Sequence, residues 1–107
     1  GLVTEKPKED VINGLKIKVR LLTKDDIKER NLPKNTTGLV ITEIDKDSPV
    51  NYLQVNNIIV EAQKKKINTI GDLDNIVKLA LKSNDKSLLI AIYNNNNQRR
   101  YIGVKLN

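Results

Sequence analysis

The stretch from Val11 to Leu22, VINGLKIKVRLL, constrains the fold more than any other part of the sequence. Apolar and basic residues alternate along it, which predicts a half-buried strand with a basic outer face. The inner face would carry Leu15, Ile17, Val19 and Leu21, and the outer face Lys16, Lys18 and Arg20.

Gly14 stands just before this alternation. Because a residue without a Cβ adopts positive φ freely, we expect the chain to curl there and to point several backbone N–H groups at one spot. Such a loop can bind the terminal carboxylate of a peptide that adds to the strand edge. The N–H groups of Gly14, Leu15 and Lys16 are the predicted donors.

The composition excludes several kinds of chemistry. The 107 residues suffice for one domain with one core, and the sequence contains no Cys and no His. Serine or cysteine nucleophiles activated by His, and zinc sites built from Cys or His, are therefore excluded. We expect no catalytic residue, no metal site and no cofactor in this chain.

The charge balance favours acidic partners. There are 19 Lys and Arg against 13 Asp and Glu, a net charge of +6. Nucleic-acid binding through Lys64–Lys66 and Arg99–Arg100 is one hypothesis, but only three Tyr are available for stacking on bases and basic residues are interleaved with acids. We therefore expect no nucleic-acid partner.

The remaining patterns predict a small α+β domain. Capping signatures at Thr23–Asp26 and Thr69–Asp72 predict a short helix to about Asn31 and a long helix to Lys82. Further predicted elements are strands at 38–44 and 58–62, a helical turn at 48–53, and a hairpin of 88–93 with 101–106. The order implies a partly open antiparallel β-barrel or sandwich of five to six strands, capped by one long and one or two short helices.

Domain boundaries follow from composition. Residues 1–10 are predicted to be a linker or the tail of a preceding domain, and residues 11–107 the domain itself. The chain starts without Met and has no signal-like or membrane-spanning apolar stretch, so we expect a fragment of a longer protein with no membrane insertion.

The long helix carries two apolar stripes. Leu73, Ile76 and Ala80 form one stripe, which is spaced for the core. The adjoining stripe consists of Asp74, Val77 and Leu81. Either the helix is deeply buried, or this second stripe forms one wall of a groove whose other wall is the strand at 15–22.

The order of these motifs resembles that of a known family. Gly38-Leu39-Val40-Ile41-Thr42-Glu43-Ile44, Ser48-Pro49, Leu53-Gln54-Val55-Asn56-Asn57-Ile58-Ile59, Ile67 and Asp72-Leu73 follow one another along the chain. This series resembles the PDZ domains of HtrA (DegP/Do-type) serine proteases, and is most similar to the second, C-terminal one. The resemblance covers about residues 12–106.

The resemblance implies a peptide-binding module of a periplasmic serine endopeptidase whose catalytic residues lie in another domain. Its partners would be peptide or unfolded-protein segments, bound by strand addition, and other PDZ or protease domains of the same oligomer. The implied peptide-binding residues are Ile12, Asn13, Gly14, Leu15, Lys16, Ile17, Asp74, Val77 and Leu81.

A structural role is the alternative. Second PDZ domains of this family often hold protomers together instead of binding free peptides. Asn13 stands where the family has an apolar residue, and Asn56-Asn57 stands where the family has Gly-Asp. These departures favour the structural role.

Overall fold

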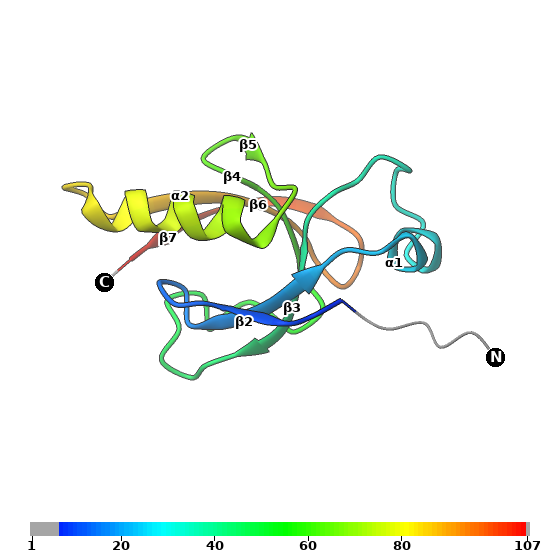
Figure 1. Cartoon of the computed structure of the whole chain (residues 1–107), viewed down its shortest axis with the longest axis horizontal. Coiled ribbons are helices and arrows are strands. Elements are labelled where there is room, and N and C mark those ends of the chain that lie inside the picture. Colours follow the sequence, from blue (N-terminus) through cyan, green and yellow to red (C-terminus); the bar gives the residue numbers. More distant parts are fainter. Residues whose placement is uncertain (1–6, 107) are drawn as a thin grey trace.

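The computed structural model describes residues 7–106, which form one antiparallel sheet and two helices (Figure 1). Residues 1–6, most of the predicted linker, lie outside the described residues, as does Asn107. In chain order the elements are β1 (Asp10–Ile12), β2 (Ile17–Leu21), α1 (Lys24–Glu29), β3 (Leu39–Ile44), β4 (Ile58–Ala62), β5 (Lys65–Lys66), α2 (Ile70–Lys82), β6 (Ser87–Tyr93) and β7 (Arg99–Lys105).

The sheet has the strand order β1-β2-β3-β4-β6-β7, with β5 paired to β4. The expected α+β class with an open antiparallel sheet is confirmed. The structure has seven strands instead of five to six, because the first predicted strand is split into β1 and β2 and because β5 was not predicted. Between β3 and β4 the ladder consists of Leu39↔Ile59 and Val40↔Ile58 alone.

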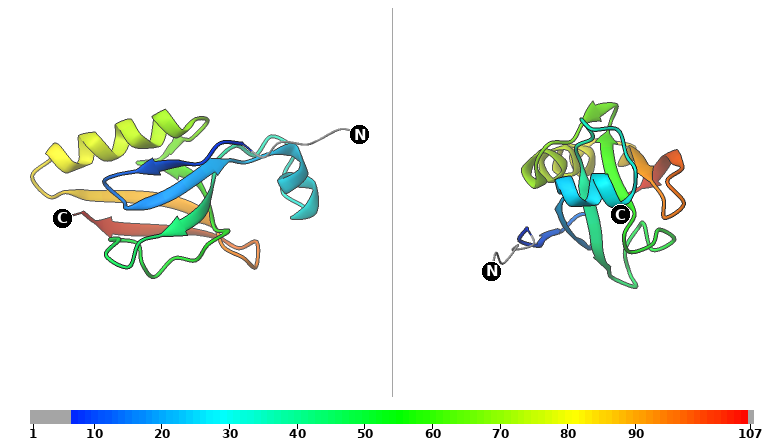
Figure 2. Two further views of the ribbon diagram at one scale, coloured as in Figure 1. Left: turned by 60° about the horizontal axis from the view of Figure 1, so that its bottom comes forward. Right: turned by 90° about the vertical axis from the view of Figure 1, so that its right-hand side faces the viewer.

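Two apolar clusters hold the fold together. The larger lies between α2 and the sheet, where α2 contacts β1, β2 and β6 (Figure 2). The smaller consists of Leu32, Val40, Ile58, Val60 and Ala91, with Ile27 of α1 packed against it. The buried side chains of both clusters are aliphatic, and Tyr93 packs against the smaller one.

Helix α2 begins with the predicted capping box. The Thr69 hydroxyl accepts a hydrogen bond from the Asp72 N–H at 3.0 Å, and the Asp72 carboxylate accepts one from the Thr69 N–H at 3.0 Å. A further bond from the Asn68 N–H helps to hold the pKa of Asp72 below its ordinary value. The buried residues of α2 are Leu73, Val77 and Ala80, whereas Ile76 of the predicted core stripe is partly buried against the larger cluster.

Three other local predictions were wrong. Residues 48–53 form successive turns instead of a helical turn, since the Asn51 and Leu53 N–H groups bond three residues back. Leu21, expected in the core, is 40% exposed at the end of β2. Arg99 and Arg100 belong to β7 instead of preceding it.

Helix α1 is attached to β2 by one ion pair. The Arg20 guanidinium donates two hydrogen bonds to the Asp26 carboxylate, at 2.7 and 3.0 Å, and the same carboxylate accepts the Thr23 N–H at 2.8 Å. These bonds, first of all the one from Arg20, lower the pKa of Asp26 from 3.8 to about 2. Asp26 therefore caps α1 and joins it to the sheet.

The Asp26→Asn variant tests this arrangement. The pKa of Asp26 is depressed in the folded state, so its stabilisation is complete above the ordinary value of 3.8 and is lost as the pH falls toward 2. We expect the substitution to cost about 1.5–3 kcal/mol at pH 7, by urea unfolding, and much less at pH 2. An equal cost at both values would contradict the assignment.

Candidate functional site

The turn between β1 and β2 uses its own backbone donors. The Leu15 N–H donates to the Ile12 carbonyl at 3.1 Å, and the Lys16 N–H donates to the Asn13 carbonyl at 3.2 Å. Two of the three predicted carboxylate donors are thus engaged within a four-residue hairpin turn. The positive φ predicted at Gly14 was also wrong, because the left-handed residue is Lys16, with φ of 50°.

Strand β1 lies along the edge of β2 where a peptide was expected to add. The register runs from Asp10↔Val19 to Ile12↔Ile17, antiparallel, and β3 pairs with the other edge of β2. In Figure 2, β1 runs between β2 and α2. The chain itself therefore follows the course that was predicted for a bound peptide.

The space between the turn and α2 is filled by side chains. A Cβ at Gly14 would overlap with Cγ1 of Val77 and would lie 3.0 Å from Cδ1 of Leu81. Val77 is 1% exposed and Ile17 is 2% exposed. Gly14 is required by this close approach of turn and helix.

The structure brings most of the nine predicted site residues together, but packs them against one another. Ile12, Leu15, Ile17 and Val77 are buried in the larger core cluster, and Leu81 is partly buried against it. Asn13 and Lys16 are exposed at the turn. The Asp74 carboxylate pairs with Lys78 at 2.8 Å on the helix surface.

Ser48 is a site residue that the sequence pattern did not reveal. Its hydroxyl, which is buried, donates to the Leu15 carbonyl at 2.6 Å and accepts from the Val50 N–H at 3.0 Å. The Asp45 N–H donates to the Lys16 carbonyl at 3.0 Å nearby. The Ser-Pro pair by itself indicates only a helix start, yet the serine fixes the β1–β2 turn.

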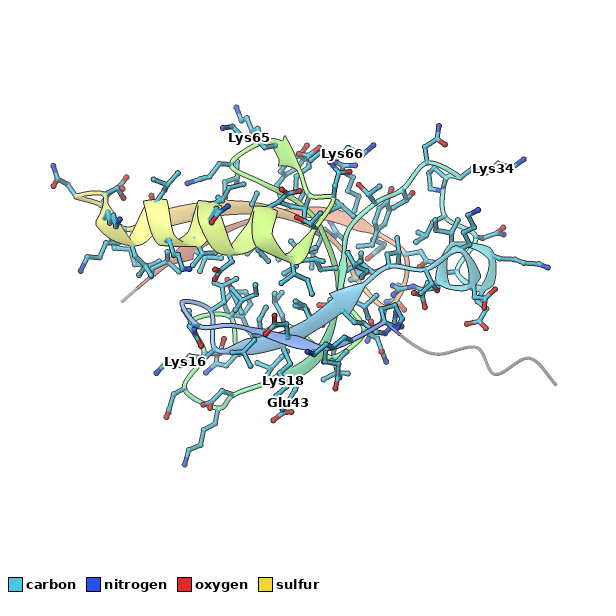
Figure 3. All side chains as sticks on the ribbon, viewed as in Figure 1. Lys16, Lys18, Lys34, Glu43, Lys65 and Lys66 are labelled. Carbon is cyan, nitrogen blue, oxygen red and sulfur yellow. The ribbon has the colours of Figure 1, made fainter. Side chains whose placement is uncertain are left out.

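The basic residues are dispersed and partly paired. Lys16 and Lys18 lie on one side of the molecule, with Glu43 beside Lys18, whereas Lys65 and Lys66 lie on the opposite side (Figure 3). The Lys18 ammonium is 3.3 Å from the Glu43 carboxylate. Lys66 and Arg99 line one shallow hollow, but Arg99 is paired there with Glu61 at 2.6 Å.

The described residues contain neither a metal-ligand cluster nor a membrane-spanning helix. Within residues 7–106, no three acidic, His or Cys side chains come together as metal ligands. Neither α1 nor α2 is long and apolar enough to cross a membrane.

The comparisons with known proteins agree with the geometry. The open antiparallel sheet with α2 alongside it defines a PDZ-like α+β fold. Among solved structures, the chain is similar to "HtrA-type protease AlgW with decapeptide", with a TM-score of 0.65 and 19% sequence identity over 86% of this chain. It spans 28% of that protease chain. No protein-family model matches the chain, and no curated protein matches its sequence.

The contact between Gly14 and Val77 can be tested by a double-mutant cycle. We expect Gly14→Ala to cost about 1–3 kcal/mol in urea unfolding, because the new methyl group overlaps with Val77. In the Val77→Ala background the same change should cost less, with a coupling of about 0.5–3 kcal/mol.

A matched control is available in the same chain. A Cβ at Gly103 meets nothing within 4 Å, so Gly103→Ala should change stability by no more than about 0.5 kcal/mol. Strictly additive effects at positions 14 and 77 would show that the turn does not pack against α2.

Proposed function

We propose that this chain is a non-catalytic interaction module of an HtrA-type serine protease, and that it acts chiefly by contacting other domains and protomers of the protease assembly. The observation that carries the proposal is the pairing of β1 with the edge of β2. A module whose groove is filled by its own strand is suited to contacts through its outer surfaces. Catalysis would belong to another domain, since this chain has no His or Cys, and the assembly would work in the periplasm.

Opening the groove beside β2 for a peptide costs free energy. A peptide could reach the β2 edge only after β1 had left, and this would expose Ile12, which is 0% exposed in the folded chain. Exposing one such side chain costs roughly 1.5–3 kcal/mol. Any peptide at the β2 edge would lose at least this much binding free energy relative to an open groove, together with the free energy of the β1–β2 pairing that it displaces.

Binding of a peptide at the β2 edge is the second candidate function. The similar AlgW protease is one whose structure includes a decapeptide, and this chain has the same fold. Here the role would require β1 to detach from β2, and Ile12, Asn13, Gly14, Leu15, Lys16 and Ile17 with Asp74, Val77 and Leu81 would then be the residues that meet the peptide.

An amide-shift titration with decapeptides that carry free or amidated C-termini separates the two functions. For contact function, we expect no shifts at residues 13–19 and 74–81 at millimolar peptide. In the full-length protease, deletion of residues 7–106 should reduce the mass of the assembly measured by sedimentation.

Asp10→Pro is the matched variant. The Val11 N–H bonds the Asp10 carboxylate at 2.8 Å and so points away from β2, which makes Asp10, opposite Val19, the residue whose N–H belongs to the β1–β2 ladder. Asp10 is exposed, so its replacement by proline weakens β1 without disturbing the core. If shifts appeared in the unmodified chain with free C-termini and vanished on amidation, the domain would be a peptide receptor and the contact proposal would be wrong. Shifts that appear only in Asp10→Pro would show that β1 closes the groove, as proposed.

A further inference from the structure

Strand β7 lies at one edge of the sheet, and the hydrogen bonds at the two ends of the β6–β7 hairpin show which of its residues point outward. The Asn94 N–H donates to the Gln98 carbonyl at 3.0 Å, and the Leu106 N–H donates to the Lys86 carbonyl at 2.7 Å, so both ends of the hairpin close on hydrogen-bonded pairs. Such pairs alternate along an antiparallel ladder. The residues whose N–H and C=O groups point away from β6 are therefore Arg99, Tyr101, Gly103 and Lys105.

This edge is exposed along its whole length. All four outward-facing residues are exposed, and within residues 7–106 none of their backbone groups has a hydrogen-bond partner. Tyr101 is 60% exposed, and the space beside Gly103 is open. At the other end of the sheet β1 has three residues, whereas β7 has seven. A long open edge of this kind is a template for another strand.

The charge of the strand selects its occupant. The sequence of β7, RRYIGVK, contains three cations and no acid, and of these cations Arg99 is already paired with Glu61 of β4 at 2.6 Å. A second copy pairing edge to edge would bring six cations into one ladder, which like-charge repulsion disfavours. We propose that β7 binds an extended acidic segment of a partner polypeptide by strand addition.

This inference rests on the proposed contact function, with β7 as the contact surface and an acidic segment as the partner. The side chains of Arg99, Tyr101, Gly103 and Lys105 share the face opposite to that of Val104, which lies in the larger core cluster, because alternate residues of a strand face the same way. An incoming strand would place an acidic side chain opposite Lys105, at one end of the edge, and another beside the Arg99–Glu61 pair at the other end. Its middle residues would lie beside Tyr101 and over the open space at Gly103.

Proline at position 103 tests the backbone contact directly. The Gly103 N–H points away from β6, so Gly103→Pro removes a docking donor without removing a bond of the β6–β7 ladder. The probe is a fluorescein-labelled nine-residue peptide, blocked at both ends, in which Glu alternates with Thr. We expect the intact chain to bind it in anisotropy titrations, Gly103→Pro to weaken binding at least tenfold, and Gly103→Ala to leave it within twofold.

Lys105→Glu supplies a second variant at an exposed position and should also weaken binding at least tenfold. A peptide with Lys in place of Glu should not bind, and amide shifts should cluster at residues 99–105. Circular dichroism checks that each variant is folded.

The following results would overturn the inference. If folded Gly103→Pro bound the peptide as tightly as the intact chain does, binding would rest on charge attraction alone and not on strand addition. Self-association that Gly103→Pro abolishes would make a second copy the occupant. If the peptide did not bind at millimolar concentration, β7 would not have this role. The proposed contact function would still stand if the amide signals of residues 13–19 and 74–81 also did not shift. Shifts at those residues instead would overturn both proposals.

Discussion

The pairing of β1 with β2 is the interaction on which the site depends. It places Ile12 in the core, directs the turn against α2, and engages the Leu15 and Lys16 N–H groups inside the hairpin. Because Val77 packs directly over Gly14, the helix cannot move away from the strand without uncovering apolar surface. One short hairpin therefore sets both the packing of the helix and the state of the groove.

Features encoded within a few residues could be predicted from the sequence. Both capping boxes form as predicted, since each needs only a Thr and an Asp three residues later. Strands β3 and β4 follow from runs of β-branched residues. The order of these elements, with the resemblance to HtrA PDZ domains, was sufficient for the fold, and the likeness to AlgW agrees with it.

The state of the site could not be predicted, because it depends on contacts between distant segments. The alternation from Leu15 to Leu21 indicates a strand but does not say which segment pairs with its edge. Gly14 was identified correctly as special, but the reason is the position of Val77, which lies 63 residues further along the chain. The choice between Ile76 and Val77 as core residue likewise depends on where β1 lies against α2.

The β6–β7 hairpin has a consequence for how the chain folds. Its seven register pairs form the longest ladder of the sheet, and its strands are joined by the short Asn-rich loop at 94–98. Strands β2 and β3, by contrast, are separated by α1 and the loop that follows it. Closing a short loop costs less chain entropy than closing a long one. We therefore expect this C-terminal hairpin to form early and to serve as the surface on which α2 and the β1–β2 hairpin later assemble.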